Sequence, residues 1–138
     1  MAVMILGVSL AGVLTAYSAA YGLAESSLSA TRAMDAAIAF AEEIRQQNPT
    51  VVSVLYSTTG EDGPHFTVDS MPNSAGSVQV NTSNPDFLEI TISVCWEQKG
   101  GRRFGEDVDM NGILSTAEDV NGNGRVDSPA MLTFRMAR

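Results

Sequence analysis

The chain has 138 residues, a length typical of one modest domain, and its 16 acidic and 8 basic side chains give a formal net charge of −8. This charge argues against nucleic-acid binding, because phosphate contacts need clustered lysine and arginine, and here only Arg102 and Arg103 are adjacent. The single cysteine, Cys95, excludes a disulfide within the chain.

The first segment is long and uninterrupted. Residues 1–24 contain no charged residue and no histidine, and no proline occurs before Pro49. We therefore expect one helix over residues 1–47, about 70 Å long, whose uncharged part covers roughly 36 Å and can cross a ~30 Å hydrocarbon core. Residues 25–48 are amphipathic, with an apolar stripe that we expect to cover the rest of the protein. The stripe consists of Met34, Ala37, Ile38, Ala41 and Ile44.

The uncharged segment, residues 1–24, has three possible interpretations. A cleaved secretory signal lacks support, because no positively charged region precedes the apolar run. A plain membrane anchor explains the run, but it does not require the helix to continue into an amphipathic half. We favour a helix that lies in the membrane and later packs among copies of itself, since alanine, glycine and serine are frequent and permit close helix contact.

Residues 49–138 are predicted to form a small sheet, because the hydrophobic period changes from 3.6 to 2. The clearest strand is DFLEITISVCWEQ (86–98), and the closing AMLTFRMAR (130–138) alternates in the same way. Shorter strands are expected at 65–70 and 77–82, and a less well-defined one at 51–57. One face of the best strand is apolar and needs a cover, which the amphipathic helix half can provide. That face carries Leu88, Ile90, Ile92, Val94 and Trp96.

The predicted fold class is therefore α+β, with a long N-terminal helix (1–48) packed on a small antiparallel sheet (49–138). In this layout the chain resembles type IV pilins and the pseudopilins of type II secretion. The stretch AVMILGVSLAGVLTAYSAAY is similar to the segment that follows the processing site in that family, and ITISVCWEQKGGRR with MLTFRMAR resembles the terminal strand pair of minor pilins. The family usually has a glutamate five residues into its processed chain. Residue 5 here is Ile5, so no processing or assembly role is placed on a residue.

The resemblance implies a structural subunit of a pilus-like or pseudopilus filament. Its partners would be copies of itself or related pilins, bound through the N-terminal helix, and the membrane before assembly. The implied location is the bacterial cell envelope: the inner membrane first, then a periplasmic pseudopilus or an extracellular pilus. The alternative is a calcium-binding surface domain that is anchored by one helix and does not polymerise. Neither interpretation involves nucleic acid or a small-molecule substrate.

The stretch GEDVDMNGILSTAEDVNGNGRVD lies within an acidic loop, residues 105–130, between the two best strands. Its first part matches a twelve-residue calcium loop, with side-chain oxygens at alternate positions, glycine at position 6 and a closing carboxylate at position 12. Calcium is the expected ion, because it takes six to eight oxygen ligands in a flexible loop. The candidate ligands of this first frame are Asp107, Asp109, Asn111, the carbonyl of Ile113, Ser115 and Glu118.

A second frame follows directly, but position 12 is Ala130, so the closing carboxylate is missing unless Glu106 or Glu118 supplies it. Its candidate ligands are Asp119, Asn121, Asn123, the carbonyl of Arg125, and Asp127. Asp, Asn and Gly are also common in solvated turns, which is the competing interpretation of both frames. Because no helix pair flanks the loop, a bound ion would have a structural role and would fix the position of the closing strand.

No catalytic constellation is recognisable. His65 is the only histidine and follows Pro64, and we expect it on the surface or at the start of a strand. Cys95 falls on the polar side of its strand, where a thiol covered by a neighbouring segment is expected. We therefore predict that the protein is not an enzyme.

Overall fold

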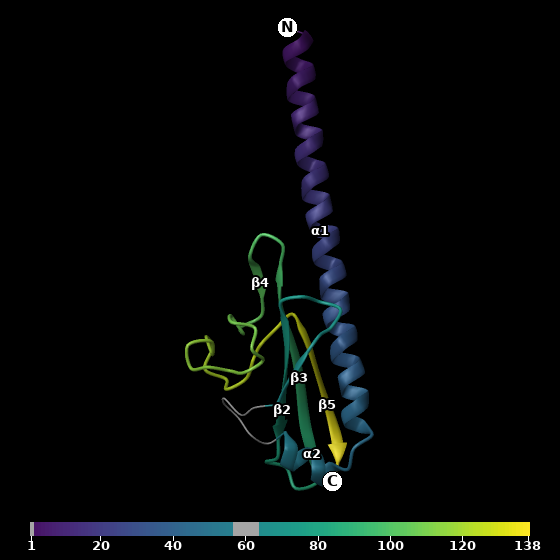
Figure 1. The fold of residues 1–138 in the computed structure, drawn as a ribbon, viewed down its shortest axis with the longest axis vertical. Coiled ribbons are helices and arrows are strands. Elements are labelled where there is room, and N and C mark those ends of the chain that lie inside the picture. The colour runs from purple at the N-terminus through teal and green to yellow at the C-terminus, as the bar shows by residue number, and fades with distance from the viewer. Residues whose placement is uncertain (1, 57–63) are drawn as a thin grey trace.

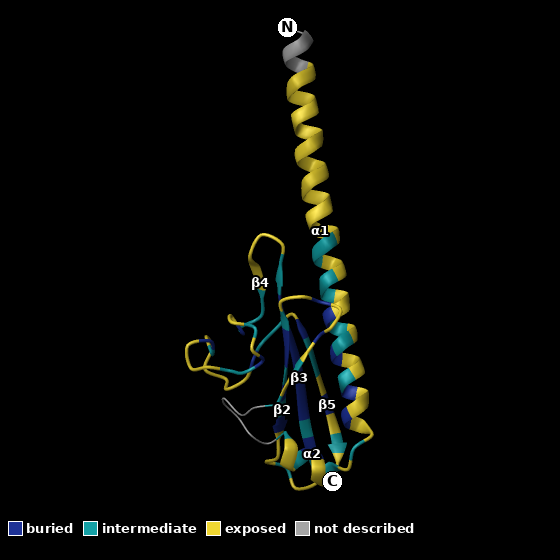
Figure 2. Cartoon of the chain, viewed as in Figure 1, coloured by how far each residue is buried: buried dark blue, intermediate teal, exposed yellow. Residues whose placement is uncertain are grey.

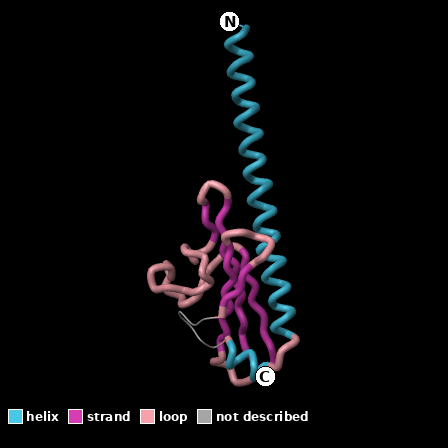
Figure 3. Tube along the Cα trace, viewed as in Figure 1, coloured by secondary structure: helices cyan, strands magenta, loops and turns pink. Residues whose placement is uncertain are grey.

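The computed structural model describes residues 2–56 and 64–138, with the backbone alone for residues 2–5. Figures 1 and 3 show a long helix whose second half lies along a small antiparallel sheet, which confirms the α+β fold expected from the sequence. The helices are α1 (Ala2–Arg45) and α2 (Pro49–Leu55). The strands are β1 (His65–Thr67), β2 (Ser74–Asn81), β3 (Phe87–Gln98), β4 (Arg102–Phe104) and β5 (Ala130–Ala137).

Strand β3 is the centre of the sheet, and all its pairings are antiparallel. Ile92 has Val78 of β2 on one side and Leu132 of β5 on the other. Further along β3, Trp96 also has a partner on each side, Ser74 of β2 and Phe104 of β4. Strands β4 and β5 therefore share one edge of β3, one after the other. The acidic loop leaves this edge after β4 and returns to it at β5.

The core lies between α1 and the sheet, as the alternating pattern of β3 predicted. Leu88, Ile90, Ile92 and Val94 are fully buried, and Trp96 nearly so. Strand β5 adds Phe134, and α1 packs against both β3 and β5. The helix contributes mostly small side chains, which bring its backbone close to the large side chains of the sheet. The fully buried residues of α1 are Ala33, Ala37, Ala41 and Ile44.

The predicted helix stripe was wrong in one respect. Ile38 is 45% exposed, and the covered face is centred instead on a row that includes Ala33, one turn before Ala37. Alanine contributes little to a hydrophobicity pattern, so the sequence reading placed the stripe too close to the larger Ile38. Packing against a flat sheet favours the row of small residues, because it permits the closest approach.

The chain between α1 and β1 also differs from expectation. Helix α1 ends at Arg45, where Gln46 and Gln47 make tighter backbone bonds to the carbonyls three residues before them. The strand predicted at residues 51–57 is wrong as far as the structure describes it, because α2 occupies Pro49–Leu55. Asn48 caps this helix by accepting a hydrogen bond from the Thr50 amide at 2.9 Å, and proline suits the first helical position. These local signals outweigh the strand preference of the valines.

The first half of α1 projects beyond the sheet, and every side chain from residue 6 to residue 24 is exposed (Figure 2). These side chains include Leu6, Leu10, Tyr17 and Tyr21, which are 61–72% exposed. By length and composition the helix can cross a membrane, and none of its most apolar stretch is buried within the protein. A helix that is apolar on all sides is normally surrounded by lipid or by other helices. This half is therefore compatible with membrane anchoring or with a signal sequence.

The acidic loop covers part of the face of the sheet that α1 leaves open. Gln79, Thr91 and Thr133 are register partners across the sheet; the Gln79 amide donates to the Gly124 carbonyl at 2.6 Å, and the two threonine hydroxyls lie 3.1 Å apart. Cys95 is fully buried beneath the loop, as expected, and a Cβ on Gly105 would collide with its sulfur. Burial raises the pKa of the Cys95 thiol to about 11, which keeps it protonated at neutral pH.

Candidate metal centre

The first predicted frame brings three carboxylates together. Asp107, Asp109 and Glu118 each place an oxygen within 4.8 Å of the other two. Asp107 is fully buried and Glu118 is 7% exposed, whereas Asp109 faces solvent. Carboxylates so close together repel one another by a few kcal/mol per ionised pair unless a cation or a proton compensates. This arrangement suits a hard cation that binds oxygen.

The two buried carboxylates are held by backbone amides of their own loop. Asp107 accepts hydrogen bonds from the amides of Asn111 at 3.2 Å and Gly112 at 2.7 Å. Glu118 reaches back across the loop and accepts from Val108 at 2.8 Å, and its other oxygen accepts from the Ser115 amide at 3.1 Å. The glutamate therefore closes the loop from position 12, as the calcium-loop pattern requires.

The electrostatics of these two carboxyl groups differ. Burial raises the pKa of Asp107, and Asp109 and Glu118 raise it further, against the opposing effect of the backbone amides. Burial also acts to raise the pKa of Glu118, but the hydroxyl and amide of Ser115 and the amides of Val108 and Asp109 lower it overall. The hydrogen bonds therefore favour the charged form of Glu118, whereas burial and the neighbouring carboxylates favour the protonated form of Asp107, an effect that a bound cation would oppose.

The first seven positions of the two frames share the same hydrogen bonds and positive φ angles. In each, the aspartate at position 1 accepts from the amides at positions 5 and 6, and the asparagine at position 5 accepts from the amide at position 7. Positions 4 and 6 have positive φ in both, at Met110 (58°) and Gly112 (78°), and at Gly122 (70°) and Gly124 (73°). The side-chain oxygens thus turn toward the inside of each loop, as the alternation in sequence predicted.

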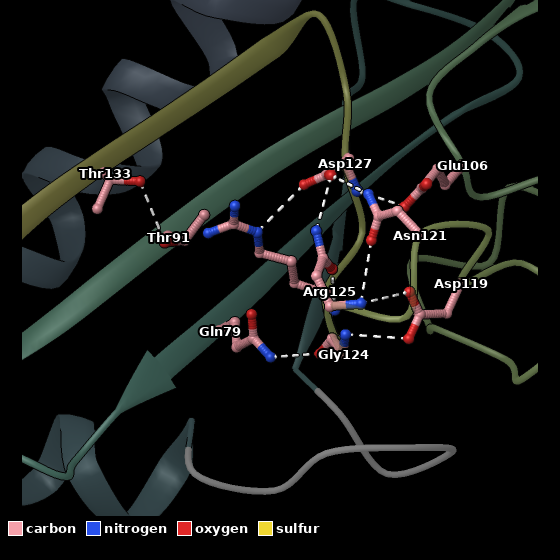
Figure 4. Close-up of polar contacts among 10 residues, drawn as sticks. Gln79, Thr91, Glu106, Asp119, Asn121, Gly124, Arg125, Asp127 and Thr133 are labelled. Carbon is pink, nitrogen blue, oxygen red and sulfur yellow. Dashed lines mark hydrogen bonds and ion pairs between the residues drawn. The ribbon is translucent and has the colours of Figure 1, made fainter.

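The second frame, drawn in Figure 4, has two carboxylates, Asp119 and Asp127, whereas the first frame has three. Asp127 accepts hydrogen bonds from the side-chain amides of Asn121 at 2.7 Å and Asn123 at 2.8 Å, and Arg125 forms an ion pair with it at 3.2 Å. Glu106 accepts from the backbone amide of Asp127 at 3.2 Å, which brings it beside this frame as the sequence reading allowed. Asp119, however, joins no three-carboxylate cluster among the residues that the structure describes. The second frame is therefore the weaker candidate.

Several of the predicted ligands make hydrogen bonds within their own loops. The Asn111 side chain accepts from the Ile113 amide at 2.6 Å, and the hydroxyl and backbone amide of Ser115 both hydrogen-bond to Glu118. The sequence reading missed Gln79, which ties the second frame to the sheet, and Val126, which is buried at position 8 of that frame. An apolar residue at position 8 is a signal that could have identified Val126. The Gln79 contact spans 45 positions and has no local signal.

Comparisons of the chain with family models, with curated proteins and with solved structures find no match.

We expect calcium binding at the first frame to weaken as the pH falls, and to do so at a higher pH than for ordinary aspartates. Calcium and a proton compete for Asp107, whose pKa is raised. In the metal-free protein the same shift has the opposite consequence: the folded head holds a proton that the unfolded chain has lost, so its stability falls as the pH rises through that pKa. Calorimetric titration at neutral and mildly acidic pH, in two buffers of different ionisation enthalpy, measures the released protons. Binding without proton release would contradict this prediction.

Proposed function

We propose that the protein is a structural subunit of a pilus-like or pseudopilus filament, with a head domain stabilised by calcium. One observation carries the proposal: the uncharged, fully exposed half of α1 is continuous with the half that packs on the sheet. Such a helix can pass from lipid into a bundle of like helices without refolding. The head stays attached throughout, because Ala33, Ala37 and Ala41 are fixed in its core.

The composition of the uncharged, exposed half of α1, called the free half below, supports contact between helices. Alanine, glycine and serine are frequent along it, and the space beside Gly7, Gly12 and Gly22 is open, because a Cβ placed there would meet nothing within 4 Å apart from the adjacent residues and the local helix backbone. Small side chains let helix backbones approach closely, which is the main source of packing energy when lipid is the competing solvent. The resemblance to type IV pilins and type II secretion pseudopilins agrees with this use of the helix.

The calcium part of the proposal depends on the first frame. The loop runs between β4 and β5, and Val126 is the only apolar residue in it that is buried, so burial alone stabilises it little. An ion held by Asp107, Asp109 and Glu118 would remove their mutual repulsion and crosslink the loop. The start of β5 would then be fixed beside β3, where β5 helps to form the surface on which α1 packs.

Removal of the uncharged segment tests the assembly role. A fragment that begins at Glu25 should be a folded monomer in plain buffer, whereas the full chain should need detergent or sediment as fibres. Analytical ultracentrifugation of both proteins measures the difference, and the buried Trp96 reports that the fragment is folded. A full chain that stays monomeric without detergent would contradict both the filament and the single-helix anchor. A full chain that binds vesicles but never forms fibres would favour the anchor.

A further inference from the structure

The turn between β3 and β4 carries an unusual concentration of positive charge. Lys99, Arg102 and Arg103 are three of the eight basic residues in a chain of net charge −8. All three are exposed, and no acidic residue occurs from Gln98 to Phe104. The segment Gln98–Phe104 is called the basic tip below.

The basic tip is firmly connected to the core. The Gly101 amide donates to the Gln98 carbonyl at 3.1 Å and closes the turn. The Arg102 guanidinium lies 4.9 Å from the centre of the Phe104 ring, and this ring stacks on Trp96 with centroids 5.0 Å apart. The charged side chains therefore lie on a rigid β3–β4 hairpin, so little conformational entropy is lost when they bind a partner.

Little of this charge is neutralised within the protein. Arg103 pairs with Glu97 at 3.4 Å, and this contact is partly exposed. Neither Lys99 nor Arg102 takes part in an ion pair among the residues that the structure describes. At least two positive charges therefore face outward from a protein whose overall charge would repel an anionic surface.

The basic tip lies close to the point at which the uncharged half of α1 ends. The tip projects along α1 toward the N-terminus and reaches the level at which the helix leaves the sheet (Figures 1 and 2). Partial burial of α1 begins at Glu25 and Ser26, directly after the uncharged run. The acidic loop lies further from the N-terminus along the long axis (Figure 1). When the uncharged half of α1 is in a bilayer, the tip therefore faces the headgroups and the acidic loop does not.

We propose that the basic tip binds the anionic headgroups of the membrane that holds residues 1–24. The proposal rests on the membrane-inserted state in the proposed function. Each basic residue near an anionic surface contributes about 1 kcal/mol, or about a fivefold change in binding. Lys99 and Arg102 together give roughly 25-fold, enough to orient the head on the membrane before assembly. In a filament, where the helix leaves the lipid, this contact is lost.

Hydrogen exchange of the full chain in lipid nanodiscs tests the proposal. One set of discs is neutral phosphatidylcholine, and the other contains one-third phosphatidylglycerol. Amides of the basic tip should exchange at least fivefold more slowly in the anionic discs, and molar salt should abolish the difference because it shortens the screening length to ~3 Å. The double variant Lys99→Gln/Arg102→Gln should lose the protection. The charge-matched control Arg135→Gln/Arg138→Gln, at the end of β5 away from the membrane, should keep it.

The outcomes separate this proposal from the function on which it rests. A chain that enters both kinds of disc but shows equal exchange of the tip would overturn the headgroup contact alone. A chain that enters neither would overturn the membrane-inserted state as well. If soluble glycerol phosphate protects the amides of the basic tip in neutral discs, the tip binds free phosphate instead of lipid headgroups. Protection that depends on protein density instead of lipid charge would assign it to a neighbouring copy.

Discussion

Replacement of Ala37 by aspartate is expected to unfold the head, whereas the same replacement at the adjacent Ile38 is expected to be tolerated. Ala37 is fully buried between α1 and the sheet, and Ile38 is 45% exposed. A buried carboxylate without a partner costs several kcal/mol, comparable to the whole stability of a small domain. On the exposed side of α1 the change should cost about 1 kcal/mol or less.

The two variants control for each other, because both add one negative charge to neighbouring positions of the same helix. Trp96 is the only tryptophan and is almost fully buried, so its fluorescence reports the state of the head during thermal melting in mild detergent. Equal melting temperatures for the two variants would mean that the helix face has been assigned incorrectly.

Calcium is expected to raise the melting temperature of the head by roughly 10 °C at a hundredfold excess over Kd, which corresponds to about 2.7 kcal/mol. Asp107→Asn and Glu118→Gln should each abolish most of the shift, because each removes a charge from the buried part of the first frame. Asp127→Asn should have a small effect, since its carboxylate already pairs with Arg125. Asp69→Asn, an exposed carboxylate of the head outside the loop, is the matched control and should keep the full shift.

Magnesium should stabilise the head much less, because it prefers rigid octahedral sites and retains its water. The calcium gain should also appear as protection of residues 105–130 and β5 from proteolysis. If calcium raises the melting temperature equally in Asp107→Asn, Glu118→Gln and the unchanged chain, the first frame does not bind the ion. No shift at millimolar calcium would identify the loop as a solvated turn.

The main elements could be predicted from the sequence because they are long and periodic. The uninterrupted run before Pro49 predicted α1, and the alternation over residues 86–98 predicted β3. Short elements were less predictable. The valines after Asn48 suggested a strand, but the cap at Asn48 and the proline at the first helical position produce α2. The buried face of α1 was predicted correctly at Ala37, Ala41 and Ile44 but wrongly at Ile38, because the small size of the alanines matters only once the sheet is beside them.

The candidate metal site also has some features that could be predicted from the sequence and others that could not. Spacing alone predicted that Asp107, Asp109 and Glu118 would share a loop, and the structure places their oxygens together. The covering of the sheet by the second frame could not be predicted, since Gln79 and Gly124 meet only through the tertiary fold. The basic tip was also overlooked, because scattered charges in a sequence do not show which of them will project beside a helix.

We expect the free half of α1 to join copies of this chain into a filament, and cryo-electron microscopy after detergent removal from the purified full chain tests this most directly. The expected result is fibres with residues 6–24 of α1 in the core and the heads outside, stable with calcium and absent for a chain that begins at Glu25. Single heads scattered on residual lipid, or soluble monomers, would contradict it.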